Sequence, residues 1–141
     1  MKIIICDDEK EYVDTVQQKV NSFLKEKNIV AEYSLYTDCK GFMDKDAETF
    51  DIAFLDIEMG EIKGIEVAEK LKEANPHIVV FIITSYDHYL DEAMDLNVFR
   101  YIKKPLDEKR VFSFHNVSDR EKRVALSYSF LCDLVLKIMR F

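Results

Sequence analysis

The sequence lacks the features that mark several large classes of protein. Its three cysteines, Cys6, Cys39 and Cys132, stand far apart and form neither a CxxC pair nor a Cys/His ligand spacing, which argues against a disulfide framework and a zinc site. No apolar run reaches about 18 residues, so no membrane-spanning helix is expected. The apolar stretch at the N-terminus is too short for a signal peptide. We therefore expect a cytoplasmic protein with reduced thiols and no membrane partner.

The chain also lacks the positive charge of a nucleic-acid-binding protein. Its formal net charge is -7, so we expect no direct contact with nucleic acid and a better match to a cation or a cationic partner. It contains no Gly-rich phosphate-binding loop, internal repeat or low-complexity segment. With 141 residues, of which 48% are hydrophobic, it has enough apolar material for one well-buried domain.

Three short apolar runs without polar interruption predict central strands that are buried on both faces. These runs are Ile3–Cys6, Ile52–Leu55 and Ile78–Ile83. Two further segments, Val30–Tyr36 and Val98–Lys103, alternate apolar and polar residues, as half-exposed edge strands do. The sequence therefore predicts five strands.

Apolar residues recur at helical spacing between these strands. The expected helices are Lys10–Asn28, a short helix through Met43, Gly64–Ala74, a weaker one over Asp87–Leu96 and one over Leu106–Asn116. Strands that alternate with helices predict an α/β fold with a five-stranded parallel sheet, doubly wound in the flavodoxin-like order 2-1-3-4-5, with helices on both faces. The second and fifth strands would then form the edges of the sheet.

The end of the chain carries another broad apolar stripe, over residues 124–141. This stripe predicts a last helix that packs on its own domain, and we regard a dimer face or a membrane-surface contact as less favoured. We divide the chain into a main domain over residues 1–120 and a C-terminal helical tail over residues 121–141. We expect no complete effector domain.

Polar side chains follow the strands at the points where the strands end. Asp7 and Asp8 follow the first strand, Asp56 the third, Thr84 the fourth and Lys104 the fifth. Because open α/β sheets bind ligands outside the carboxyl ends of their strands, we expect these side chains to lie close together. Neighbouring carboxylates raise one another's pKa and need a compensating cation. Oxygen ligands without imidazole or thiolate favour Mg²⁺ as that cation.

The same residues suit phosphoryl transfer. Lys104 offers an ammonium group to a carboxylate or a phosphoryl oxygen, Thr84 offers a hydroxyl, and the Glu58 main-chain carbonyl adds a metal ligand. Asp56 would be the nucleophile and would form an aspartyl-phosphate. Taken singly, each residue also has an ordinary interpretation as a solvated turn residue at a strand end.

Asp8 also has a specific structural interpretation, as the cap of a helix rather than a metal ligand. Together with Glu11 it fits a capping box at the start of the Lys10–Asn28 helix, and taken alone this interpretation is the stronger one.

In combination, these residues resemble the receiver domain of bacterial two-component response regulators. The resemblance is carried by IIICDDE, LDIEM, IITS and YIKKP, with Gly64 eight residues after Asp56, and it covers roughly residues 1–116. It implies that a sensor histidine kinase transfers a phosphoryl group to Asp56, in two-component signal transduction. Gly64 and Pro105 would be structural residues.

The resemblance also implies roles for the surrounding residues. Asp8 would bind Mg²⁺ directly, Asp7 largely through water, and Glu58 through its carbonyl, while Lys104 would contact the phosphoryl group.

By the same resemblance, phosphorylation operates a switch. Thr84 would turn toward the phosphoryl group and Tyr101 would swing inward, which remodels the face made by the fourth helix, the fifth strand and the fifth helix. Without a switch, Tyr101 would be a half-buried aromatic residue of an edge strand. The Lys104-Pro105 bond is expected to be cis, whereas general frequencies favour trans. A homodimer through the switch face or through the C-terminal tail is left open.

The sequence differs from most receivers at Gly60, where they carry proline, and we therefore expect a looser loop after Asp56. The variants DIEM, KGIEVA, TSYDHY and RYIKKPLD are similar to receivers that precede LytTR-type DNA-binding domains. That similarity implies a role in transcription regulation, although too few residues follow Pro105 for such a domain.

Two other functions use the same residues. A Mg²⁺-dependent phosphohydrolase with an aspartyl nucleophile shares the chemistry until water attacks the intermediate, but the sequence shows no second catalytic acid and no cap insertion. A dimerising interaction module without phosphotransfer would leave the acids without a role. We favour a phosphoacceptor that is not an enzyme beyond slow self-catalysed phosphorylation and dephosphorylation.

Overall fold

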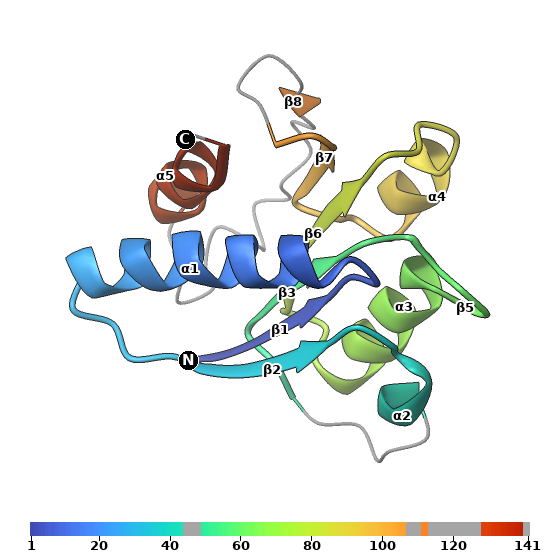
Figure 1. The fold of residues 1–141 in the computed structure, drawn as a ribbon, viewed down its shortest axis with the longest axis horizontal. Coiled ribbons are helices and arrows are strands. Elements are labelled where there is room, and N and C mark those ends of the chain that lie inside the picture. Colours follow the sequence, from blue (N-terminus) through green and yellow to red (C-terminus); the bar gives the residue numbers. More distant parts are fainter. Residues whose placement is uncertain (44–48, 107–110, 113–127, 140–141) are drawn as a thin grey trace.

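The strands form one sheet with helices on both of its faces, as the computed structural model shows (Figure 1). The structure describes residues 1–43, 49–106, 111–112 and 128–139. The strands are β1 (Lys2–Cys6), β2 (Glu32–Tyr36), β3 (Ile52–Leu55), β4 (Glu58–Met59), β5 (Ile62–Lys63), β6 (Val79–Thr84), β7 (Arg100–Lys103) and β8 (Val111–Phe112). The helices are α1 (Lys10–Glu26), α2 (Lys40–Met43), α3 (Gly64–Ala74), α4 (Leu90–Asp95) and α5 (Tyr128–Met139).

The main sheet has the order β2-β1-β3-β6-β7-β8, and its first five strands are parallel. The predicted order 2-1-3-4-5 is therefore confirmed for the parallel part. Alternate residues of each central strand enter two different cores. In β1, Ile3 and Ile5 pack with α1 and α5, while Ile4 and Cys6 pack on the side of α2, α3 and α4. Burial on both faces explains why the central strands read as unbroken apolar runs.

The prediction of a helix over Leu106–Asn116 is wrong at Val111 and Phe112. These two residues form β8, which pairs antiparallel with Tyr101 and Ile102 of β7. Valine and phenylalanine favour the extended conformation, and the outer side of β7 supplies backbone partners that no local pattern reveals. Strand β7 is consequently not the edge of the sheet. Apart from Leu106, the rest of the predicted helix lies outside the described residues.

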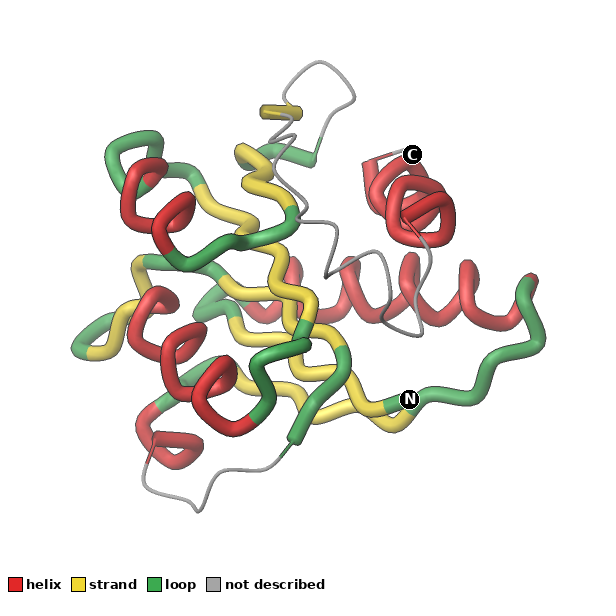
Figure 2. Tube along the Cα trace, turned by 180° about the vertical axis from the view of Figure 1, so that it is seen from behind, coloured by secondary structure: helices red, strands yellow, loops and turns green. Residues whose placement is uncertain are grey.

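Helix α5 packs against α1, so the prediction of a last helix on its own domain is confirmed (Figure 2). The Phe23 and Phe130 rings meet edge to face at 5.1 Å between centroids. The Lys19 ammonium donates a hydrogen bond to the Ile138 carbonyl at 2.6 Å. The proposed boundary between residues 120 and 121 lies outside the described ranges and stays a prediction. Within the described part of the chain, no helix is both long and apolar enough to cross a membrane.

Candidate functional site

The ends of three parallel strands bring two acids and one lysine into direct contact. Asp7 follows β1, Asp56 follows β3 and Lys104 follows β7. The Lys104 ammonium lies 2.8 Å from an Asp7 carboxylate oxygen and 3.0 Å from an Asp56 carboxylate oxygen. Residues about fifty positions apart thus meet at one edge of the sheet, as the strand-end pattern predicted.

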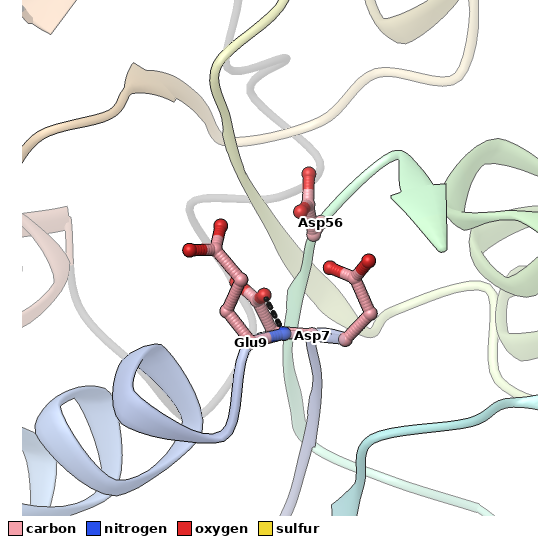
Figure 3. A group of neighbouring side chains, drawn as sticks. Asp7, Glu9 and Asp56 are labelled. Atoms are coloured by element: carbon pink, nitrogen blue, oxygen red, sulfur yellow. Dashed lines mark hydrogen bonds between the residues drawn. The ribbon is translucent and has the colours of Figure 1, made fainter. Parts of the chain in front are cut away.

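Four carboxylates surround this contact. One carboxylate oxygen from each of Asp7, Asp8, Glu9 and Asp56 lies within 4.8 Å of the others. Figure 3 shows Asp7 and Glu9 at the end of β1 and Asp56 at the end of β3. Asp7 and Asp56 are each 4% exposed, whereas Asp8 and Glu9 are exposed to solvent. The cluster is therefore buried at Asp7 and Asp56 and open to solvent at Asp8 and Glu9.

Glu9 is the member of this cluster that the sequence interpretation missed. Its carboxylate accepts a hydrogen bond from Lys104 at 3.0 Å. The signal was present as the third acid of the CDDE run, but a residue just before a helix would ordinarily be assigned to solvent.

Backbone amides fix the two buried carboxylates. The Ile57 amide donates to Asp56 Oδ1 at 2.6 Å, and the Glu9 amide donates to Asp7 Oδ1 at 2.9 Å. The second contact takes the place of the predicted capping box at Asp8. Helix α1 begins at Lys10, as predicted, but Glu9 is its N-cap residue and makes no side-chain cap hydrogen bond, so the interpretation of Asp8 as the cap is wrong. The Asp8 carboxylate belongs to the acidic cluster instead.

Lys104 is 5% exposed and is held on several sides. Its ammonium lies 4.0 Å from the centroid of the Tyr12 ring, in addition to its contacts with Asp7, Glu9 and Asp56. Burial lowers the pKa of Lys104, but hydrogen bonds to Asp7 and Glu9 outweigh burial and raise its pKa overall, so the lysine stays charged.

Asp7 is the group whose burial is not fully compensated. Burial raises the pKa of its carboxyl from 3.8 to about 6, against the opposing effect of hydrogen bonds from Lys104 and the Glu9 amide. One ammonium shared among several carboxylates leaves a net negative site, which is the electrostatic condition for binding a cation.

Thr84 and Tyr101 are both tied to Tyr86 rather than to the acids. The Thr84 hydroxyl accepts a hydrogen bond from the Tyr86 amide at 3.4 Å, and the Tyr101 hydroxyl donates to the Tyr86 carbonyl. Tyr101 is fully buried, so its interpretation as a half-buried edge residue is wrong. Burial also raises the pKa of the Tyr101 hydroxyl. The Lys104 amide donates to the Thr84 carbonyl at 2.8 Å and joins the two strand ends.

The segment after Asp56 is a short hairpin made by β4 and β5. The expectation of a looser loop stays a prediction. Gly60 stands at its turn with a φ of 78°, a conformation that glycine adopts without strain. At Gly64, an added Cβ would lie 1.8 Å from the Asp56 carbonyl oxygen, and the Gly64 amide donates to the Ile57 carbonyl at 2.8 Å. Only glycine fits this approach. The Lys104-Pro105 bond is cis, as the resemblance implied.

A doubly wound sheet with acids after its first and third strands, and a lysine and a cis proline after its fifth parallel strand, defines the receiver class of α/β domain. The sequence matches the family described as the response regulator receiver domain over residues 3–114. The chain belongs to this family.

Relatives and solved structures agree with this assignment. The sensory transduction protein LytT of Bacillus anthracis is 34% identical over 112 residues, which are 79% of this chain and 44% of that protein. The transcriptional regulatory protein BtsR of Escherichia coli (strain K12) is 32% identical over 114 residues, with 79% and 45% covered. The chain thus spans less than half the length of these curated relatives.

Solved receiver structures share the fold. The BeF3-activated DrrB receiver domain superposes with a TM-score of 0.62 at 23% identity, over 74% of this chain and 84% of that chain. The response regulator protein TrrA from Thermotoga maritima, in complex with Mg(2+)-BeF, gives a TM-score of 0.56 at 24% identity, over 73% and 85%.

Proposed function

We propose that this receiver domain accepts a phosphoryl group on Asp56 from a sensor histidine kinase. The observation that carries the proposal is the contact of Asp56 with Lys104 inside a cluster of four carboxylates. The Asp56 carboxylate is buried beside the exposed acids Asp8 and Glu9, and the Ile57 amide already holds its Oδ1. Oδ2, beside Lys104, is therefore the oxygen presented to a phosphoryl donor.

The donor set fits Mg²⁺. Four carboxylates against one ammonium leave excess negative charge, and the cluster contains only oxygen ligands, which hard divalent ions prefer. Asp7, Asp8 and Asp56 would hold the ion, together with the main-chain carbonyl of Glu58, which lies two residues beyond Asp56. When bound, Mg²⁺ would neutralise negative charge on the phosphoryl oxygens.

The transfer is a displacement at phosphorus. Asp56 Oδ2 attacks the phosphorus atom of a phosphohistidine, a new P–O bond forms, the P–N bond breaks, and its electron pair leaves with the imidazole. Lys104 would exchange a carboxylate partner for a phosphoryl oxygen, which requires only a small shift of an ammonium that already touches Asp56.

The proposed switch follows from the partners of Tyr86. Thr84 would leave the Tyr86 amide to donate its hydroxyl proton to a phosphoryl oxygen, which frees one end of the segment before α4. Because Tyr101 is already fully buried, its inward position does not need to be created by phosphorylation. The consequence for a partner would be a changed surface around Tyr86 and α4, the surface on which we place a homodimer contact.

The wider role remains part of the proposal. The relatives' names, a sensory transduction protein and a transcriptional regulatory protein, favour a role in the control of transcription. We place this role in the cytoplasm, as the sequence interpretation expects.

Incubation with acetyl phosphate and Mg²⁺ tests phosphotransfer, with intact-mass measurement as the readout. We expect one phosphoryl group per chain and none on the Asp56→Asn variant, which keeps the shape of the side chain but lacks the nucleophilic carboxylate. Labelling of Asp56→Asn would remove this residue from the role. Rapid release of many equivalents of phosphate would favour the phosphohydrolase alternative over a phosphoacceptor.

A further inference from the structure

A buried tyrosine outside the acidic cluster connects two segments that border it. The Tyr89 hydroxyl donates a hydrogen bond to Glu58 Oε1 and accepts one from the Lys63 ammonium at 2.9 Å. The Lys63 ammonium also lies 4.8 Å from the centroid of the Tyr89 ring. Tyr89 is only 6% exposed and belongs to the same core as α3. The Tyr89 hydroxyl thus donates one hydrogen bond to a carboxylate and accepts one from an ammonium.

The three residues come from different elements. Glu58 begins β4, Lys63 ends β5, and Tyr89 is the residue before the first turn of α4. The hairpin follows Asp56 directly, and the segment that ends in Tyr89 begins at Thr84, the last residue of β6. A single hydroxyl therefore clamps the segment after β3 to the segment after β6.

The contacts among Glu58, Tyr89 and Lys63, which we call the clamp, also hold the Glu58 carboxylate away from the acidic cluster. This carboxylate faces the Tyr89 hydroxyl, with Lys63 beside it, and is not one of the four carboxylates of the acidic cluster. The hydrogen bond from Tyr89 to the Glu58 carboxylate is charge-assisted and part-buried, and such bonds are strong and directional.

We propose that Tyr89 is a positioning residue for the Mg²⁺ site: by holding Glu58, it fixes the hairpin that carries the Glu58 carbonyl and couples occupation of the site to the start of α4. This inference rests on the proposed function, because it takes the Glu58 carbonyl as a metal ligand. Tyr89 itself contacts neither the acidic cluster nor a phosphoryl group; its effect passes through the backbone of β4.

The test is a double-mutant cycle on Mg²⁺ affinity, measured by calorimetry on the full chain. Tyr89→Phe removes the hydroxyl and keeps the ring, so we expect its Mg²⁺ dissociation constant to rise by about three- to tenfold. In a Glu58→Ala background, the same change should have no further effect, because the acceptor is already gone. Glu58→Gln, which keeps an acceptor oxygen, should retain most of the affinity.

A matched control is available in β2, where Tyr33 packs against the core on the other face of the sheet from Tyr89. Tyr33→Phe removes a buried hydroxyl that has no hydrogen-bond partner among the described residues, and it should leave Mg²⁺ affinity unchanged. Hydrogen exchange in EDTA gives a second readout. The Gly64 amide, which donates to the Ile57 carbonyl at the base of the hairpin, should exchange faster in Tyr89→Phe than in the wild type or in Tyr33→Phe.

The outcomes separate this inference from the proposed function. If the wild type binds Mg²⁺ and Tyr89→Phe binds equally well, or loses the same factor with and without Glu58, the positioning role is wrong and the phosphoacceptor site stands. If the wild type binds no Mg²⁺, or if Asp8→Ala does not change the binding, the proposed metal site itself fails. Faster exchange confined to the hairpin and to α4 would support the coupling.

Discussion

Replacing Asp7 by asparagine should stabilise the metal-free protein at neutral and alkaline pH. Asp7 is 4% exposed, and burial raises the pKa of its carboxyl from 3.8 to about 6. A carboxyl with a raised pKa is destabilising wherever it is ionised in the folded state, so the cost is fully present above about pH 6. At about 1.4 kcal/mol per pH unit, the difference amounts to about 3 kcal/mol at pH 8.

Asparagine approximates the protonated acid and should recover much of this free energy, while Lys104 keeps Asp56 and Glu9 as partners. As the pH falls, the folded wild type takes up a proton that the unfolded chain does not bind. Its disadvantage relative to Asp7→Asn should therefore shrink to about half at pH 5. Urea unfolding in EDTA at pH 8 and pH 5 measures both values.

Asp14→Asn is the matched control. Asp14 forms an exposed pair with Lys10 at 3.1 Å within α1, so its replacement should change the free energy of unfolding by less than about 0.5 kcal/mol, equally at both pH values. If Asp7→Asn were less stable than the wild type at pH 8, the attraction of Lys104 would outweigh the cost of burial, and our assignment of Asp7 as the uncompensated group would be refuted. Added Mg²⁺ should stabilise the wild type more than Asp7→Asn.

Two further predictions concern packing and thiol chemistry. Gly64→Ala should lower the free energy of unfolding by about 1–3 kcal/mol, because the added Cβ would lie 1.8 Å from the Asp56 carbonyl oxygen. Gly41→Ala is the control and should not destabilise the protein, because the space around Gly41 is open. Urea unfolding compares the two variants, and equal stability would contradict the close approach at Gly64. A hydrogen bond of the Cys6 thiol to Cys39, together with burial, raises the pKa of Cys6. A thiol reagent should therefore modify the less buried Cys132 first and leave Cys6 unmodified until unfolding; early loss of Cys6 would count against this.

The strands and helices that were predicted correctly are those whose own residues carry a recognisable hydrophobic pattern. Ile52–Leu55 and Gly64–Ala74 were predicted with the bounds that the structure shows, because a strand buried on both faces leaves an unbroken apolar run and an amphipathic helix leaves a clear periodicity. The meeting of Asp7, Asp56 and Lys104 was also predictable, since parallel strands align their carboxyl ends.

What sequence reasoning missed depends on partners distant in the chain. Val111 and Phe112 are extended because β7 pairs with them, and the adjacent residues in the sequence show no pattern that predicts this pairing. The hairpin after Asp56 is too short to show alternation. Glu9 joins the cluster because the Lys104 ammonium reaches it across the sheet edge, a contact of two residues 95 positions apart.

Strand β8 changes what another protein can bind on this side of the molecule. It occupies the outer backbone groups of Tyr101 and Ile102, so that a second chain cannot extend the sheet by pairing with the middle of β7. A dimer formed on this side would have to recognise side chains around α4. Among the described strands of the main sheet, only β2 and β8 have a single neighbour, and β2 is the longer of these two edge strands. Extension of the sheet by a foreign strand would therefore involve β2 or the outer side of β8.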